Sequence, residues 1–96
     1  MTKDHIKLIC TAYVKLLKEM GHNPIENPDK PLDHCAWMSQ KTIELIEEGA
    51  SDRKIGTWLG FVQGVFYSDG IFTIDDMRNH NRNIEDAKAS GLDIDS

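Results

Sequence analysis

Apolar residues recur at intervals of three and four along three long segments of the chain, 2–20, 32–48 and 52–69. Such intervals place side chains on one face of an α-helix. In the first segment this face consists of Ile6, Ile9, Cys10, Tyr13, Leu17 and Met20. The pattern therefore predicts three amphipathic helices of similar length.

Glycine, proline and serine mark the ends of these helices. Gly21, Gly49 and Gly70 follow the three apolar segments, where glycine is favoured as a C-terminal cap. Three prolines between positions 22 and 31 exclude a continuous helix there. Ser51 precedes the third segment and is a favoured N-cap residue. The sequence thus predicts a tight, polar connection after the first helix and an end of the second helix at Gly49.

A shorter fourth helix is predicted after Gly70. Thr73 followed by Asp76 resembles a capping box, with aspartate where glutamate or glutamine is usual. We expect this helix to end near Asn83. Beyond it, apolar residues are sparse among acidic and small ones, which indicates a flexible acidic tail over 84–96. The predicted fold is all-α, a small bundle of three main helices and one short helix in a single domain, 1–83.

Three glycines at intervals of four, Gly56, Gly60 and Gly64, lie inside the most apolar segment of the chain. Each glycine costs a helix interior about 0.5–1 kcal/mol relative to alanine. A smooth ridge of glycines allows another helix, a partner chain or a ligand to approach closely. Three interpretations remain open: packing inside the fold or across a dimer, a surface for a foreign partner or ligand, and accidental tolerance.

Gln63 lies next to this ridge, in a helix that we expect to be covered nearly all round. A buried carboxamide needs hydrogen-bond partners, so Gln63 either cross-links two helices or recognises a ligand, and the structural role is favoured. Repeated G-x-x-x-G is known from membrane helices, but Gln63 and the flanking charges argue only for close contact here. The predicted helix-contact ridge consists of Gly56, Gly60, Gln63 and Gly64.

Composition and charge limit the range of functions. A chain of 96 residues with 40% hydrophobic content forms one modest core, and five of the seven aromatic residues, between positions 58 and 72, predict where that core is centred. The formal net charge is −5, and no basic patch of the size that nucleic acid needs is visible. Residues 26–52, with two basic and seven acidic side chains, carry −5. Nucleic acid is not expected as a partner.

The sequence does not indicate catalysis, a cofactor or a metal site. Cys10 and Cys35 fall on apolar helical faces without a preceding signal sequence, which predicts buried free thiols in a reducing cytoplasm. The four histidines show no zinc-binding spacing, and phosphate-loop and nucleophile-elbow motifs are absent from the sequence. No apolar run approaches the length of a membrane span. We therefore expect a non-enzymatic protein without contact to a membrane.

The densest polar cluster of the chain surrounds His80. Arginines next to asparagines recognise a carboxylate or a phosphate, although a solvated helix end is the simpler interpretation. Aromatic and imidazole side chains in the second helix add a possible stacking surface. The candidate partner or ligand surface consists of His34, Trp37, Arg78, His80, Asn81 and Arg82.

Two stretches carry a resemblance to a known family. The sequences W-L-G-F-V-Q-G-V at 58–65, G-I-F-T-I-D-D-M-R at 70–78 and H-N-R at 80–82 resemble a family of small uncharacterised proteins encoded by tailed bacteriophages. His34, Trp37 and Met38 are similar to a second, weaker signature of that family. The resemblance covers residues 33–82 and implies a viral accessory protein made in the cytoplasm of a bacterial host, with no assigned activity to carry over.

These observations lead to three functional hypotheses. The first is a helical interaction module that modulates a host or viral protein, such as a host defence component, or forms a homodimer. The second is a small-ligand binder that sequesters a nucleotide or signalling molecule in a cleft between protomers, through Arg78, Arg82 and a stacking Trp37 or Tyr67. The third is an acidic mimic of nucleic acid, based on the charge of 26–52 and of the tail.

Overall fold

The computed structural model describes residues 1–94, and this range folds into an all-helical bundle without strands. The five helices are α1 (Lys3–Glu19), α2 (Pro31–Glu47), α3 (Asp52–Ser68), α4 (Ile74–Arg82) and α5 (Ile84–Ala89). The predicted fold class is therefore confirmed: three main helices of 17 residues each are followed by short C-terminal helices.

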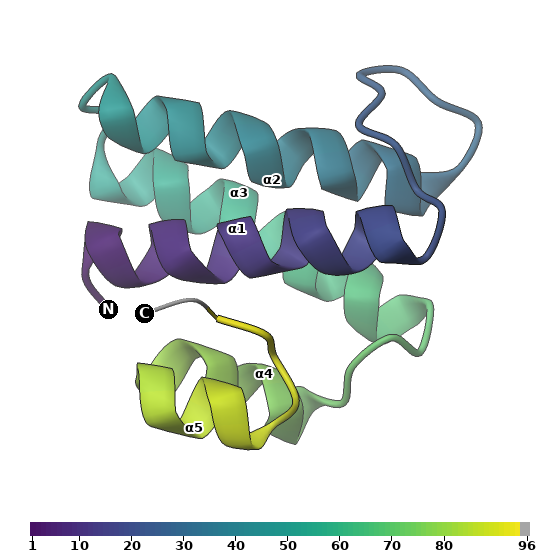
Figure 1. Ribbon diagram of the computed structural model, residues 1–96. Helices are drawn as coiled ribbons and strands as arrows, with labels where there is room; N and C mark the ends of the chain where they lie inside the picture. Colours follow the sequence, from purple (N-terminus) through teal and green to yellow (C-terminus); the bar gives the residue numbers. More distant parts are fainter. Residues whose placement is uncertain (95–96) are drawn as a thin grey trace.

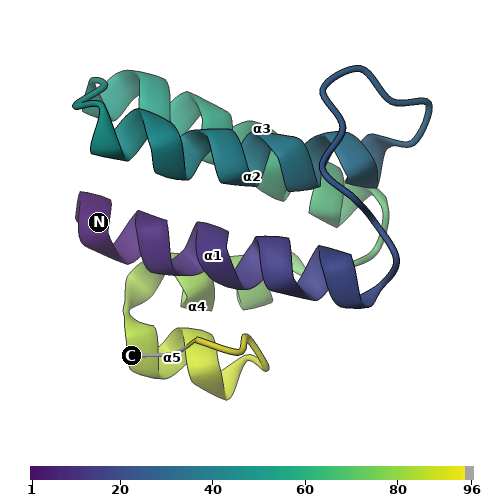
Figure 2. The same cartoon turned by 45° about the horizontal axis from the view of Figure 1, so that its top comes forward.

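The first helix occupies the middle of the molecule. Helices α2 and α3 pack on one side of α1, and α4 with α5 lies on the other side (Figures 1 and 2). The connection at 20–30 reverses the chain, so that α2 runs antiparallel to α1 (Figure 1). Because α1 lies between α2 and α4, residues of α2 and residues of α4 face different sides of the bundle.

Local capping explains where the predicted helices begin and end. The Ser51 hydroxyl accepts a hydrogen bond from the Lys54 amide at 3.2 Å, which satisfies a free donor of the first turn of α3. At the other end Gly70 adopts φ +70°, and the next residue, Ile71, donates its amide to the carbonyl of Phe66 at 2.8 Å. This arrangement is a Schellman motif, and its positive φ suits glycine.

The capping box of α4 is also present. The Thr73 hydroxyl accepts from the Asp76 amide, and the Asp76 carboxylate accepts from the Thr73 amide, both at 3.0 Å. The backbone hydrogen bond from Thr73 lowers the pKa of Asp76, because it stabilises the ionised carboxylate. Aspartate thus replaces glutamate in this motif without loss of either hydrogen bond.

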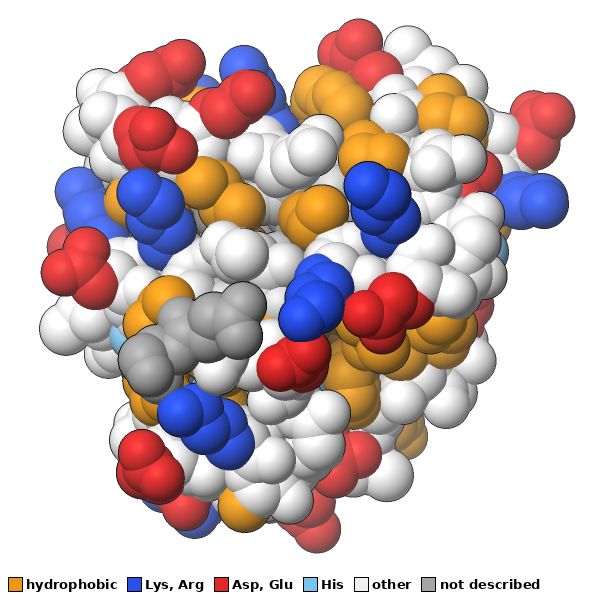
Figure 3. Space-filling view, in the orientation of Figure 1, with side chains coloured by type: hydrophobic (Ala, Val, Ile, Leu, Met, Phe, Trp, Pro, Cys, Tyr) orange, Lys and Arg blue, Asp and Glu red, His pale blue; other side chains and the backbone are white. Residues whose placement is uncertain are grey.

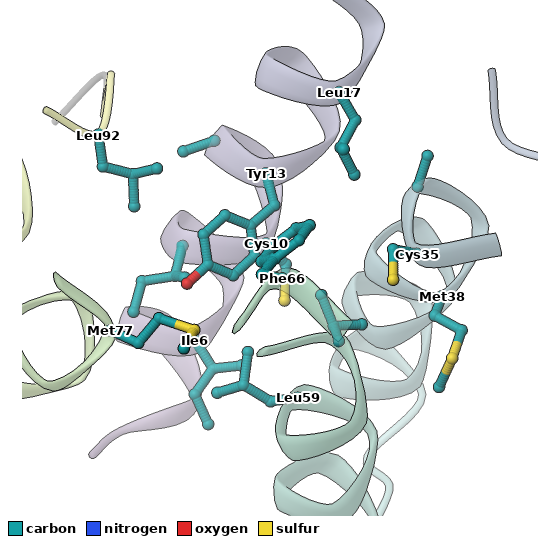
Figure 4. Packing of buried hydrophobic residues seen from close by; sticks show 14 of the residues in the cluster. Ile6, Cys10, Tyr13, Leu17, Cys35, Met38, Leu59, Phe66, Met77 and Leu92 are labelled. Atoms are coloured by element: carbon teal, nitrogen blue, oxygen red, sulfur yellow. The ribbon is translucent and has the colours of Figure 1, made fainter. Parts of the chain in front are cut away.

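The core is centred on Tyr13 of α1, which is fully buried. Its ring meets Phe66 of α3 edge to face, with 4.8 Å between the ring centres, and Phe72 at 6.0 Å. Side chains from α1, α3, α4 and the segment after α5 gather around Tyr13 (Figure 4). The core thus includes part of the aromatic segment 58–72, but its centre lies in α1.

The predicted flexible tail is wrong for residues 84–94. Asn83 caps α5 by accepting the Asp86 amide at 2.8 Å, and both Leu92 and Ile94 are buried in the core. The apolar residues of this segment are few, but they cover the side of α1 that α2 and α3 leave open (Figure 2). The domain therefore extends through 94, and the last two residues of the predicted tail lie outside the described range.

Charged side chains of both signs are scattered over the face shown in Figure 3. On the face shown in Figure 3, lysine and arginine side chains alternate with aspartate and glutamate, and several lie next to one another. Lys7 pairs with Glu47 at 3.9 Å, and Lys41 pairs with Glu44 at 3.3 Å. Within residues 1–94, no helix combines the length and apolarity required to cross a bilayer.

Candidate functional site

The three glycines of α3 lie on the outside of the bundle. Gly56, Gly60 and Gly64 are exposed, and a Cβ atom added to any of them would meet no atom within 4 Å. The ridge therefore has no close neighbour within the chain. The interpretation that it packs inside the fold is wrong, and so is the expectation that α3 is covered nearly all round.

The glycines form the centre of a broader surface, which we call the α3 outer face. Its residues are all exposed: Arg53, Gly56, Thr57, Gly60, Phe61, Gly64, Tyr67 and Ser68. Phe61 is 51% exposed and Tyr67 is 57% exposed, so two large aromatic side chains lie open on the same face as the glycines. The surface thus combines an open backbone with aromatic side chains available for contact.

An aromatic cluster adjoins the α3 outer face at Phe61. The His34 ring lies 6.0 Å from Phe61 and stacks on Trp37 at 5.7 Å between ring centres, and Trp37 contacts Trp58 at 5.9 Å. The Nδ1 atom of His34 is buried and makes no hydrogen bond within the described chain. Two predicted surface residues, His34 and Trp37, therefore join α3 through this cluster.

Gln63 points away from the glycine ridge and into the bundle. It is 9% exposed, and its amide nitrogen donates to the Tyr13 hydroxyl at 3.1 Å and to the Asn81 amide oxygen at 2.7 Å. Asn81 returns a hydrogen bond to the Gln63 oxygen at 3.0 Å. Gln63 thus ties α3 to α1 and α4. The predicted cross-linking role is confirmed, whereas the placement of Gln63 in an outward contact ridge is wrong.

His80 is also internal, with 0% exposure, so its prediction as a surface residue is wrong. Its Nδ1 atom lies 2.7 Å from the Tyr13 hydroxyl, which also accepts from Gln63. With the Tyr13 hydroxyl as donor to Nδ1, the imidazole is neutral and carries its proton on Nε2, an atom that finds no hydrogen-bond partner within residues 1–94. Burial lowers the pKa of His80, although the carboxylate of Asp76 opposes the shift.

The remaining predicted residues, Arg78 and Arg82, are exposed on α4 and already have partners. Arg78 lies 3.5 Å from Asp75, and Arg82 lies 3.3 Å from Asp86 of α5. Figures 1 and 2 place α4 across α1 from α2, which carries the stacked His34. The six residues of the predicted partner surface therefore do not form one site.

Neither of the two cysteines is activated as a nucleophile. Burial raises the pKa of the Cys10 thiol to about 12 and that of Cys35 to about 11, so both thiols are protonated and weakly nucleophilic at neutral pH. Within residues 1–94, no group of three or more histidine, cysteine, aspartate or glutamate side chains is arranged to hold a metal ion.

A small pocket lies between α1 and the segment that follows α5. Its volume is about 90 Å³, well below the roughly 300 Å³ at which small-molecule sites begin. It is lined by Ala12, Lys15, Leu16, Glu19, Gly91, Leu92 and Asp93. The pocket does not accommodate a nucleotide.

The predicted contact ridge and partner surface leave out five residues of the α3 outer face: Arg53, Thr57, Phe61, Tyr67 and Ser68, of which Tyr67 was named only as a stacking residue for a nucleotide. Arg53 and Tyr67 stand seven positions before and after Gly60, and seven residues are nearly two helical turns. They therefore share the face of the glycines, and this spacing was available in the sequence.

Comparison of the chain with models of known protein families, with curated proteins and with solved structures gives no match.

Proposed function

We propose that this protein is a non-enzymatic interaction module that binds another protein through the α3 outer face. The observation that carries the proposal is the exposure of three helical glycines without any neighbouring atom. The glycines cost α3 about 1.5–3 kcal/mol together relative to alanine, and no internal contact offsets this cost. Binding of a partner close to the α3 backbone would offset this cost, because glycine has no side chain to keep the partner away.

The aromatic side chains beside the glycines support the same proposal. Phe61 and Tyr67 expose more than half of their surface on one face, and Phe61 continues into the aromatic cluster with Trp58. Aromatic residues are enriched at the centres of protein interfaces because they bury large areas with little loss of side-chain entropy. The resemblance to phage proteins is the ground for proposing a host or viral protein as the partner, in the cytoplasm of a bacterium.

The two other hypotheses receive less support from the geometry. Arg78 is paired with Asp75 of α4, Arg82 is paired with Asp86 of α5, and Trp37 is packed into the aromatic cluster across the bundle. Within one protomer, the arginines and Trp37 therefore lie on different sides of α1. An acidic mimic would need uninterrupted negative charge, whereas Glu44 and Glu47 each pair with a lysine.

The proposal is tested by native mass spectrometry of protein purified gently from bacterial cells. The experiment compares wild type with Gly60→Leu, which fills the ridge, and with Thr11→Leu, which adds the same side chain at an exposed position of α1. We expect a bound protein, a copy of this chain or another one, in wild type and in Thr11→Leu but not in Gly60→Leu. Equal binding by all three proteins, or a retained small molecule on a bare monomer, would contradict the proposal.

A further inference from the structure

The α3 outer face has an internal symmetry about Gly60. This glycine is the midpoint of Asp52–Ser68, with Gly56 and Gly64 four residues away on either side. Arg53 and Tyr67 stand seven residues away on either side, so both share the central line of the face with Gly60. When the helix is reversed end to end about Gly60, Gly56 and Gly64 take each other's places along the axis. Arg53 and Tyr67 also take each other's places.

A dimer with a two-fold axis needs a face that is complementary to a reversed copy of itself, and the α3 outer face meets this condition. In such an interface, residue i of one copy contacts residue j of the other, and j contacts i. An antiparallel pair of α3 helices with its axis at Gly60 places Gly56 against Gly64 of the second copy. It also places each Arg53 against the Tyr67 ring of the second copy, a favourable pairing of a cation with an aromatic face.

The charge on Arg53 supports this arrangement over others. Within residues 1–94 the Arg53 guanidinium makes no ion pair or hydrogen bond, whereas the neighbouring Asp52 already faces Lys3 at 3.8 Å. A parallel pair would bring two Arg53 side chains together and leave them to repel one another. The antiparallel pair gives both arginines a partner and both exposed tyrosines a cover.

We propose that a second copy of this chain occupies the α3 outer face, with its own α3 packed antiparallel about Gly60. The inference rests on the proposed function and names its partner. The glycines allow the two α3 helices to pack closely, and the pairing of Arg53 with Tyr67 favours their antiparallel orientation. Phe61, at the edge of the face, packs against the side of the second α3 helix. One helix pair buries less than the roughly 1,200 Å² of a standard interface, so the dimer is weak and depends on concentration.

Cysteine cross-linking tests the direction of pairing directly. Gly56→Cys, Gly60→Cys and Gly64→Cys each place a thiol on the open ridge without a clash, and the native Cys10 and Cys35 are buried. A disulfide needs Cα atoms about 4.4–6.8 Å apart, which only facing positions of close helices reach. The three variants are oxidised with copper phenanthroline, singly and in pairwise mixtures, after circular dichroism has verified the fold, and wild type gives the background.

The antiparallel pair predicts that Gly60→Cys forms a homodimeric disulfide at least tenfold faster than Gly56→Cys or Gly64→Cys alone. It also predicts that a mixture of Gly56→Cys with Gly64→Cys forms a mixed disulfide at a rate similar to that of Gly60→Cys. Efficient cross-linking of all three single variants would establish a parallel pair and overturn the inference.

Sedimentation velocity separates this inference from the proposed function. Wild type and Thr11→Leu are expected to dimerise as their concentration rises, and Gly60→Leu to dimerise at least tenfold more weakly. If wild type stays monomeric at every concentration and no variant cross-links, the inference that a second copy occupies the α3 outer face is overturned. The proposed function would still hold after that result if wild type bound a different protein and Gly60→Leu abolished this binding. If Gly60→Leu did not affect binding of any protein, the proposed function would be wrong as well.

Discussion

Replacement of the three ridge glycines by alanine is expected to stabilise the isolated chain. Gly56, Gly60 and Gly64 are interior residues of α3, and an added methyl group meets no atom within 4 Å. Each glycine in an exposed helix interior is about 0.8–1 kcal/mol less favourable than alanine, partly because glycine leaves the unfolded chain more freedom. The triple variant should therefore gain about 2–3 kcal/mol in the free energy of unfolding.

This gain is large enough to measure by heat or by denaturant. For a domain of this size, 1 kcal/mol raises the melting temperature by about 4–8 °C, so a rise of roughly 8–24 °C is expected. Urea unfolding followed by circular dichroism, at low protein concentration, gives the free energy for the monomer. Gly49→Ala is the matched control, because Gly49 adopts φ +82°, where alanine is strained and should lose about 1 kcal/mol.

A triple variant that is no more stable than wild type would refute the reasoning. It would mean that the ridge has a neighbour in solution which the isolated chain does not show, or that α3 is not helical around Gly60. The dependence on concentration adds a second criterion. If the ridge binds a second copy, the advantage of the alanine variant should shrink as the concentration rises, because only wild type gains stability from association.

Three further predictions concern the core and the polar network. Tyr13→Phe keeps the ring but leaves Gln63 and His80 without the shared hydroxyl, and should lower the free energy of unfolding by about 1–3 kcal/mol in urea titrations. Leu92→Ala should cost about 2–5 kcal/mol, measured in the same way, because Leu92 is buried; a flexible tail would give no change. The lowered pKa of His80 means that the unfolded chain binds a proton first as the pH falls below about 6.5. Stability should therefore be full above this pH and decline until His80 also protonates in the folded state, as urea midpoints between pH 7.5 and 5 would show.

The limits of the first four helices were predictable because the signals are local. The Ser51 hydroxyl meets an amide three residues away, and the Schellman motif at Gly70 joins residues five apart. Such hydrogen bonds depend on the neighbouring backbone rather than on the rest of the fold. An N-cap residue at the start of a helix and a glycine after its end therefore predict these two limits from the sequence alone.

The last helix carries similar signals, yet its prediction as a flexible tail was wrong. Asn83 caps α5, and the Gly91 amide closes its end by donating to the carbonyl of Lys88 at 3.0 Å. The helix has only six residues, too few for a repeated apolar face. Its stability comes from packing of Leu92 and Ile94 into the core, and this depends on a surface of α1 that the local sequence does not describe.

The site was harder to predict because the direction of a side chain depends on which helices surround it. Gln63 and Gly60 are three residues apart on α3, yet one faces the core and the other faces solvent. Once Gln63, Asn81 and His80 are placed, their polar groups are largely satisfied by one another and by Tyr13. These satisfied polar groups need no hydrogen-bond partner from outside the chain. The unfavourable helix propensity of the exposed glycines, in contrast, is offset by no contact within the chain. Of the two predicted sites, the glycine ridge therefore remains, without Gln63, and it widens into the open face of α3.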